Sequence, residues 1–361
     1  MHIDWNWIKQ RPHFIAEGLS HFFKVDAWHE KTYAGKRNLV NNSTQKHPNL
    51  SVQCIKRLPF SRFCIIYHIN VLINRIILRK CYKNADIIWV PYSLYLPYYK
   101  KNNRQTIVYD CMDDILEFDL LSTSVKKRIM KYEKCLINQA DIVIASSDYL
   151  RNILIERHGV LKPIEIVNNA ISLPPGEQIN PLPDFLTSIF ADKSTKKIVF
   201  IGTISTWLDF DLILQSLKEN NNIEYLLFGP CEVKIPPHPK IKVFGAVEYK
   251  YVFPIMRAAD CLVMPFVVSD LVKSMNPVKV YEYIYASKPV IIPLYGETQQ
   301  FKEYVYLYQS AEEYAALLND LTHDRLNIKQ TEIAHHNFAL RNTWDNRVDE
   351  IRQLFLKHGI V

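Results

Sequence analysis

Short apolar runs rich in β-branched residues alternate with amphipathic segments along this chain, and they form two series. Such runs are typical of strands that are buried on both faces of a parallel sheet. The first series is DIIWV (86–90), TIVYD (106–110), DIVIAS (141–146) and IEIVNN (164–169). The second is KKIVFIG (196–202), IEYLLFG (223–229), IKVFG (241–245), DCLVMP (260–265) and PVIIP (289–293). Strands that alternate with helices predict two α/β domains, each a doubly wound, Rossmann-like parallel sheet.

The boundary between the domains is indicated by residues 173–195, which contain four prolines and interrupt the alternation. We expect an N-terminal domain over residues 1–175, a linker over 176–195 and a C-terminal domain over 196–340. Residues 341–361 end in an amphipathic pattern, TWDNRVDEIRQLFLKHGIV, which predicts a helix that packs back on the N-terminal domain. A chain of 361 residues is long enough for two such cores.

The N-terminal domain departs from the usual order, because the helical pattern KQRPHFIAEGLSHFF begins at Lys9 with no strand before it. This order suggests that the first strand is missing through a start that lies upstream. Further along, TSVKKRIMKYEKCLINQA predicts a helix with Ser124 as its N-cap.

Positive charge is concentrated in the first half of a chain whose net charge is +7. Between Lys31 and Arg104 there are 14 basic residues and one acid, Asp86. This predicts a surface that faces an anionic partner, for which membrane lipid, a phosphorylated acceptor and nucleic acid are the alternatives. The apolar and basic run 59–83 is either an amphipathic helix at an anionic bilayer or a buried helix with basic ends.

The cysteines and the N-terminus bear on the cellular compartment. Seven scattered cysteines without a CxxC spacing indicate a reducing environment. The N-terminus lacks the pattern of a secretory leader, and no run of about 18 apolar residues occurs. We therefore expect a cytoplasmic protein that is peripheral on the inner face of the cell membrane if its acceptor is lipid-linked.

The most informative motif is MNPVKVYEYIYASKPVIIP (275–293), in which a loop leads into a helix and then a strand. Lys279 and Glu282 are three residues apart and share one helix face. A lysine in the first helical turn can meet a diphosphate, and a carboxylate one turn later can accept hydrogen bonds from ribose hydroxyls. The alternative is an ordinary ion pair on a solvated helix.

This motif resembles the donor-binding signature of GT-B glycosyltransferases, in particular family-4-like enzymes of bacterial surface polysaccharide assembly. The segments WNWIKQRPHFIAEGL (5–19), VYDCMDD (108–114), ADIVIASSDYLRNIL (140–154) and FIGTISTWLDFDLI (200–213) are similar to other parts of these enzymes. The resemblance implies two Rossmann-like domains that face each other across a cleft, with the donor held by the C-terminal one. It also implies a nucleotide diphosphate sugar, most commonly a UDP-sugar, as donor. No metal and no cofactor are expected, because Lys279, the helix start and the glycine loop can stabilise the leaving diphosphate and no DxD motif occurs in a suitable loop.

The resemblance assigns donor-binding roles to residues of three segments. They are Gly202, Thr203 and Ser205 of the glycine loop, Gly229 and Val247 at the nucleobase, and Asn276, Pro277, Val278, Lys279 and Glu282 of the motif. Lys279 would also act in catalysis, by stabilising the leaving diphosphate. Glycine at Gly202 is equally consistent with a tight turn. Retaining members of the family have a second glutamate eight positions before Glu282, where this chain has Ser274, so the stereochemistry stays open.

On the acceptor side, Asp110, Asp113 and Asp114 follow a predicted strand, at the edge where ligands of α/β sheets bind. Asp113 or Asp114 can serve as the general base of an inverting transfer, or can cap the following helix. Arg11 is a candidate for binding a phosphate, and His13 for contacting the acceptor hydroxyl, although a lone histidine is more often a packed residue.

These features together predict a glycosyltransferase that adds a sugar to a lipid-linked glycan in capsule, exopolysaccharide or O-antigen assembly. A nucleotide-sugar 2-epimerase of the same fold is one alternative. A noncatalytic protein that binds sugar nucleotides or nucleic acid is another, although the paired aromatics of common RNA-binding motifs are absent from the sequence, so nucleic acid is not expected. The donor sugar, the acceptor, the linkage and the oligomeric state are not determined by the sequence.

Overall fold

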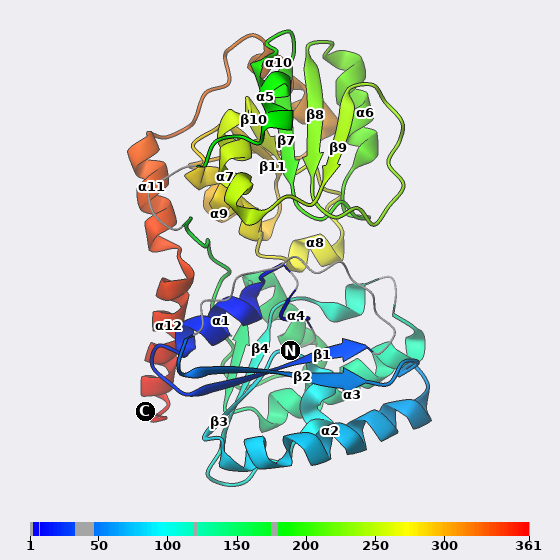
Figure 1. Cartoon of the computed structure of the whole chain (residues 1–361), viewed down its shortest axis with the longest axis vertical. Coiled ribbons are helices and arrows are strands. Elements are labelled where there is room, and N and C mark those ends of the chain that lie inside the picture. The colour runs from blue at the N-terminus through cyan, green and yellow to red at the C-terminus, as the bar shows by residue number, and fades with distance from the viewer. Residues whose placement is uncertain (1–2, 7, 33–46, 119–120, 175–179, 361) are drawn as a thin grey trace. The chain divides into compact units, whose positions relative to one another are not determined.

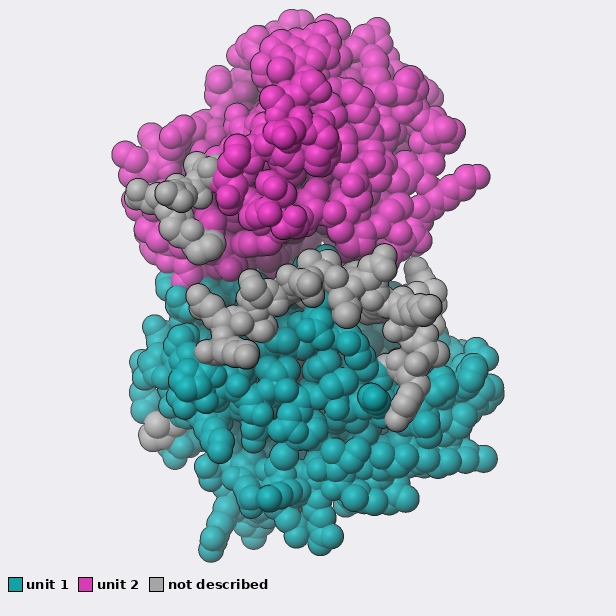
Figure 2. Space-filling model, viewed as in Figure 1, with its two compact units in different colours: residues 1–169, 344–361 teal, residues 170–343 magenta. Residues whose placement is uncertain are grey.

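The computed structural model of the chain describes residues 3–6, 8–32, 47–118, 121–174 and 180–360. The chain forms two compact units, which are drawn in different colours in Figure 2. Unit 1 consists of residues 1–169 and 344–361, and unit 2 of residues 170–343. Each unit contains parallel strands and helices (Figure 1), which confirms the predicted α/β class.

The larger sheet of unit 1 has four parallel strands in the order β3-β4-β5-β6. They are β3 (Ile87–Val90), β4 (Thr106–Cys111), β5 (Ile142–Ala145) and β6 (Glu165–Ile166); each lies within a predicted run except β4, which extends one residue beyond it. Ile107, Tyr109 and Val143 of this sheet pack with helical leucines in one buried cluster. The apolar runs are therefore buried in a parallel sheet, as their composition predicts.

A second, two-stranded parallel sheet in unit 1 was not predicted. It pairs β1 (Val25–Thr32) with β2 (Leu50–Arg57) in a register that starts at Val25 and Leu50. In β2 only Ile55 is buried, so the strand lacks the apolar run that marks the others. Its pairing with β1 is a tertiary feature that local hydrophobicity does not reveal.

The helices of unit 1 include the first and the last helix of the chain. They are α1 (Arg11–Leu19), α2 (Cys64–Asn84), α3 (Thr123–Gln139), α4 (Asp148–His158) and α12 (Trp344–Lys357), with short 3₁₀ segments η1 (Ser93–Tyr98) and η2 (Ile115–Glu117). The rings of Phe14 and Trp344 stack at 4.9 Å, and Gly18 lies against Val348. The C-terminal helix is thus packed on the first helix of the chain, within unit 1 (Figure 1).

Unit 2 has one six-stranded parallel sheet in the order β9-β8-β7-β10-β11-β12. The strands are β7 (Lys196–Ile201), β8 (Ile223–Phe228), β9 (Ile241–Gly245), β10 (Cys261–Val263), β11 (Val290–Pro293) and β12 (Tyr306–Tyr308). The first five were predicted. Numbered within the unit this order is 3-2-1-4-5-6, which is the Rossmann order, and it reverses direction between β7 and β10.

Two buried clusters cover the two faces of this sheet, and the alternation of side chains along β7 shows how they are separated. Ile198 and Phe200 face one cluster, whereas Val199 and Ile201 face the other. Helices α6 (Phe210–Glu219) and α10 (Ala311–Thr322) cover the first face. Helices α5 (Asp184–Ala191), α7 (Tyr249–Ala258), α9 (Val278–Tyr285) and α11 (Glu332–Arg341) contribute to the second.

Two local predictions are wrong. The stretch predicted as a linker contains α5, whose Leu186 and Phe190 are buried in the second cluster of unit 2, so this part of the chain belongs to a core. Proline content concealed it because the prolines precede the helix. Ser124 is not an N-cap, since α3 starts after Ser122. Residues 176–179 of the predicted linker and 33–46 of the basic stretch lie outside the described residues.

Candidate functional site

Three strands of unit 2 end in glycines, and these ends form the carboxyl edge of its sheet: Gly202 after β7, Gly229 after β8 and Gly245 in β9. The Gly202 N–H donates to Phe228 O at 2.9 Å, and the Gly229 N–H to Gly245 O at 2.7 Å. Gly229 has φ 141°, and a Cβ there would lie 1.9 Å from Gly202 O. Glycine at 229 is therefore required both by its backbone conformation and by space.

The loop after Gly202 is held in place by contacts with neighbouring segments. The Ile204 N–H donates to Pro230 O at 2.8 Å, and Trp207 Nε1 donates to Thr203 O at 3.2 Å. Ser205 Oγ donates to Glu232 Oε2 at 3.0 Å. The loop predicted to lie beneath the donor phosphates is therefore ordered at the point where the strand order reverses, which is where nucleotides bind in this class of sheet.

Lys279 and Glu282 both lie on α9, which begins after Pro277 without a side-chain cap. Lys279 Nζ is 2.6 Å from Glu282 Oε2. The side chain of Glu282 is only 6 % exposed, whereas that of Lys279 is 34 % exposed. The alternative of a solvated surface pair does not describe this geometry, because the carboxylate is buried and the ammonium can reach solvent.

The remaining predicted donor residues hold the loop before α9 or lie near the sheet edge. Asn276 is 3 % exposed, and its Oδ1 accepts a hydrogen bond from Tyr281 Oη at 3.2 Å. Val278 is the first residue of α9, and Val247 is half-buried against the second apolar cluster of unit 2. Ser274, eight positions before Glu282, is fully buried in α8 (Asp270–Ser274) and donates to Leu271 O at 2.7 Å.

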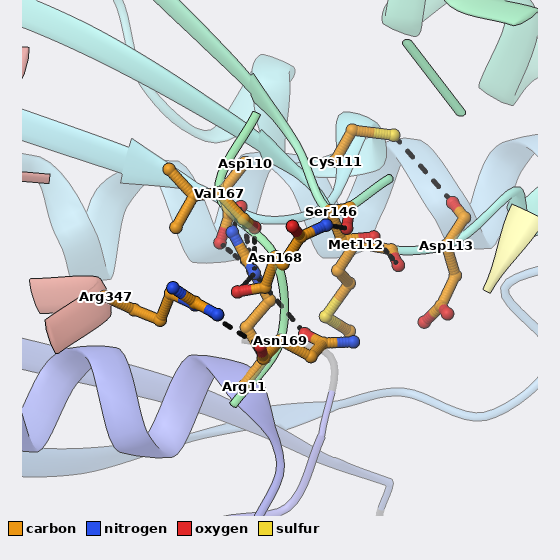
Figure 3. Close-up of polar contacts among 10 residues, drawn as sticks. All are labelled: Arg11, Asp110, Cys111, Met112, Asp113, Ser146, Val167, Asn168, Asn169 and Arg347. Atoms are coloured by element: carbon orange, nitrogen blue, oxygen red, sulfur yellow. Dashed lines mark hydrogen bonds and ion pairs between the residues drawn. The ribbon is translucent and has the colours of Figure 1, made fainter. Parts of the chain in front are cut away.

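At the corresponding carboxyl edge of unit 1, Arg11 donates hydrogen bonds to several groups (Figure 3). Arg11 Nη2 and Nε donate to the carboxylate of Asp110 at 2.8–3.1 Å, and Nη1 donates to Val167 O at 2.7 Å and to Asn169 Oδ1 at 3.3 Å. Arg11 is 4 % exposed and Asp110 is fully buried. From α12, Arg347 Nε donates to Asn169 O at 3.3 Å.

This arrangement ties the ends of β4 and β6 to α1 and α12, and it engages the guanidinium of Arg11 fully. A buried arginine with a bidentate carboxylate partner has a mainly structural effect. The geometry therefore favours an internal cross-link for Arg11 over the predicted phosphate contact. Neither Asn169 nor Arg347 was identified from the sequence. Asn169 is 158 positions from Arg11, and Arg347 is 178 positions from Asn169, so no local pattern links them.

The two candidate bases, Asp113 and Asp114, differ in their surroundings. Asp114 is 2 % exposed, forms an ion pair with Arg157 and accepts the Leu116 N–H at 3.3 Å, so it caps η2. Asp113 is half-buried, and Figure 3 shows its side chain apart from the Arg11–Asp110 group. Burial raises the pKa of Asp113 to about 7, against the effect of Arg11 and together with that of Asp110 and Asp114. A carboxyl group with a pKa near 7 is suited to general-base catalysis near neutral pH.

His13 lies at the start of α1 and is fully buried. Its Nδ1 accepts the Gln10 N–H at 3.1 Å, which completes a capping box. Burial lowers the pKa of His13 to about 4, so the ring is neutral at pH 7. This environment favours the packed histidine over the predicted contact with an acceptor hydroxyl.

The described ranges of the chain can be considered for metal binding and for membrane-spanning helices. No cluster of three or more His, Cys, Asp or Glu side chains in those ranges is placed to hold a metal ion. None of the described helices has the length and apolar character needed to cross a bilayer.

Comparison with known proteins identifies the fold. No protein-family model matches the chain. The chain is 26 % identical over 216 residues to "Putative teichuronic acid biosynthesis glycosyltransferase TuaH" of Bacillus subtilis, a match that covers 56 % of this chain and 54 % of TuaH. The chain thus spans about half the length of this curated relative.

Solved structures match over nearly the whole chain. Sucrose-phosphate synthase from Thermosynechococcus elongatus aligns with a TM-score of 0.70 at 13 % identity, over 96 % of this chain and 92 % of that one. A trehalose-6-phosphate structure from E. coli, bound with UDP-2-fluoro glucose, aligns with a TM-score of 0.69 at 13 % identity, over 96 % and 97 % of the two chains. The predicted resemblance is confirmed: this chain has the GT-B fold of glycosyltransferases.

Proposed function

We propose that this protein is a glycosyltransferase that uses a nucleoside diphosphate sugar, with the donor bound at the carboxyl edge of unit 2. The observation that carries the proposal is the Lys279–Glu282 pair at the start of α9, in a sheet of Rossmann order. A lysine side chain that is one-third exposed, beside an uncapped helix start, suits an anionic diphosphate, and a buried carboxylate suits ribose hydroxyls. The fold similarity to a UDP-sugar complex and the sequence similarity to TuaH support it.

In this proposal the donor rearranges the pair. The ammonium of Lys279 turns from Glu282 to the diphosphate, and Glu282 exchanges that partner for the ribose. As the bond between the sugar and the diphosphate breaks, negative charge develops on the leaving oxygen, and Lys279 stabilises that charge. The backbone N–H groups at the start of α9 add to the same effect.

We further propose that Asp113 of unit 1 is the general base of an inverting transfer. Its carboxylate takes the proton of the acceptor hydroxyl while the oxygen forms a bond to the anomeric carbon, and the nucleoside diphosphate leaves with the bonding electrons. The support for this role is the pKa of about 7 of Asp113 and its freedom from the ion pair that engages Asp114. These side chains require no metal for the transfer.

For the substrates, we propose a UDP-sugar as donor and a lipid-linked glycan of a cell-surface polysaccharide as acceptor. The donor is suggested by the UDP-2-fluoro glucose bound to the E. coli structure, and the acceptor class by the teichuronic acid role in the name of TuaH. A lipid-linked acceptor would bring a cytoplasmic protein to the inner face of the cell membrane.

The test is a thermal-shift screen of the whole chain against nucleoside diphosphates and their sugars, because a ligand that binds the folded state raises its melting temperature. We expect UDP and UDP-sugars to stabilise the wild type, and Lys279→Met and Glu282→Gln to abolish the shift. Lys196→Met is the matched control, since Lys196 is also 2.6 Å from a carboxylate, that of Asp324, but lies at the opposite end of β7.

Three results would contradict the proposal. No shift with any nucleotide would exclude the donor site, and equal shifts in wild type and Lys279→Met would exclude the assigned residues. Conversion of the donor to its 2-epimer in the absence of an acceptor would identify an epimerase instead.

A further inference from the structure

Helix α2 of unit 1 buries mainly polar side chains and exposes apolar ones, which is the reverse of an ordinary surface helix. Its buried side chains are Tyr67, Asn70 and Asn74. Its outward side chains include six large aliphatic residues that are 39–76 % exposed, namely Ile65, Ile69, Leu72, Ile73, Ile76 and Ile77. Their spacing of three and four residues places them on one face of the helix, as a continuous apolar stripe.

The orientation of α2 is set by polar contacts on its inner face. Asn70 Oδ1 accepts the Leu58 N–H at 2.9 Å, and its Nδ2 donates to Leu58 O at 3.2 Å. The guanidinium of Arg128 lies 4.0 Å from the centre of the Tyr67 ring. Folding of unit 1 therefore uses the polar side of α2 and leaves its apolar stripe in water, which is unfavourable for the protein alone.

Positive charge borders the stripe at both ends. Exposed basic side chains occupy the last turns of α2, namely Arg75, Arg79, Lys80 and Lys83, and no acidic residue occurs between Cys64 and Asn84. Before the helix, the guanidinium of Arg62 lies 5.0 Å from the ring centre of Phe63, which is 54 % exposed. An apolar stripe between cations matches the boundary between acyl chains and anionic headgroups.

We infer that α2 lies flat on an anionic membrane, with its aliphatic stripe among the acyl chains and its basic side chains on lipid phosphates. Its 21 residues correspond to a rod of roughly 31 Å at about 1.5 Å per residue, long enough to anchor unit 1 along one side. Figure 1 shows α2 along the outside of unit 1. The inference rests on the proposed function for its biological setting, while its physical argument depends on α2 alone.

A second copy of the chain is a less suitable occupant of this stripe. Two copies of α2 that met face to face would add their positive charges at one interface, and neither helix has an acidic side chain to offset them. A membrane that contains anionic lipid supplies both the apolar phase and the opposite charge.

The experiment is flotation of the full chain with vesicles of phosphatidylglycerol and phosphatidylcholine, compared with vesicles of phosphatidylcholine alone. We expect binding to the anionic vesicles that weakens with added salt. Ile65→Ser/Leu72→Ser/Ile76→Ser should lower the partition coefficient at least about tenfold, because three aliphatic side chains that the bilayer would bury are lost. Arg79→Gln/Lys80→Gln/Lys83→Gln should remove the preference for anionic vesicles.

Leu161→Ser/Ile333→Ser provides the matched control, since these side chains are 99 % and 74 % exposed and lie outside α2. It should bind vesicles as the wild type does. Equal binding by the wild type and the α2 serine variant would overturn the inference, and so would a wild-type dimer that this variant converts to a monomer while neither binds vesicles. The nucleotide thermal shift, measured on the same variants, separates failure here from failure of the donor site.

Discussion

The carboxyl edges of the two units are built from similar residues but differ in what remains available to a ligand. In unit 1, Arg11 and Asp110 are buried and satisfy each other, and Asn169 joins them to Arg347 of α12. In unit 2, Glu282 is buried, while Lys279 is one-third exposed and has a single short contact to it. At the edge of unit 1 the charged groups are fully paired with each other, whereas at the edge of unit 2 Lys279 can leave Glu282 to bind a ligand.

This difference separates charged residues that stabilise a unit from charged residues that suit a substrate. A buried bidentate ion pair is costly to break, so it holds elements together but adapts poorly to a ligand. A pair with one exposed member loses less when that member turns to a new anion. By this criterion Lys279 is a stronger candidate than Arg11 for phosphate binding, and Asp113 a stronger candidate than Asp114 for catalysis.

The largest expected effect comes from Asp113, the residue at the unit 1 edge that the closed network leaves out. We predict that Asp113→Asn lowers kcat by about 10²–10⁴, the usual contribution of a general base. The wild-type kcat/KM should rise with pH and level off above about pH 7, because the raised pKa of Asp113 leaves its carboxyl protonated below that value. The measurement is the pH–rate profile with donor and acceptor. An Asp113→Asn enzyme that kept this profile would show that another group titrates.

The next effect tests whether the buried Arg11–Asp110 ion pair stabilises unit 1. Asp110→Asn should reduce the free energy of unfolding by about 3–5 kcal/mol, since it leaves the buried guanidinium of Arg11 without its counter-charge. Chemical denaturation followed by circular dichroism measures this change. Asp349→Asn is the control, because the Asp349–Arg352 pair is exposed and should contribute less than about 1 kcal/mol. Equal losses in both variants would erase the contrast between the two edges.

At the unit 2 edge, Lys279→Met should lower kcat by about 10²–10³, as expected when one group that stabilises developing charge is removed. Its free energy of unfolding should fall by less than that of Asp110→Asn, since only Glu282 of this pair is buried, whereas both members of the Arg11–Asp110 pair are. Steady-state kinetics and denaturation of the same variant give both values. If Lys279→Met instead kept full activity but unfolded readily, Lys279 would stabilise unit 2 and would not act on the substrate.

The smallest effect concerns the contact between α1 and α12 within unit 1. A Cβ on Gly18 would lie 2.4 Å from Val348 Cγ2, so Gly18→Ala should cost about 1–3 kcal/mol through overpacking. The second substitution Val348→Ala should restore part of that loss by making room. Thermal unfolding of the single and double variants tests this. A double variant no more stable than Gly18→Ala would mean that α1 and α12 do not limit each other there.

Much of the fold was predictable because the strands are local apolar runs. Nine predicted strands, including DIIWV and KKIVFIG, lie where the structure has β3 to β11. Three strands escaped prediction: β1 and β2 lack an apolar run because polar and charged residues interrupt them, and β12 has only three residues. Helix α5 escaped for a different reason, because the prolines before it suggested a linker.

The candidate site was predictable only in part. Lys279 and Glu282 are three residues apart on one helix, so the sequence alone places them together. The partners of Arg11 are 99 and 158 positions away, and that of Asp114 is 43 away, so no local pattern indicates them. Exposure also decides between roles, and it depends on which elements pack against each residue.

The amino-acid order by itself therefore determined the α/β class, the positions of most strands and the spacing of the lysine and glutamate on α9, because these follow from periodicity within a few residues. Only the tertiary structure decided that Arg11 is paired with Asp110, that Asp114 is paired with Arg157 while burial raises the pKa of Asp113, and that α2 turns its isoleucines outward. Those outcomes depend on burial and on contacts between distant segments, which exist only once the chain has folded.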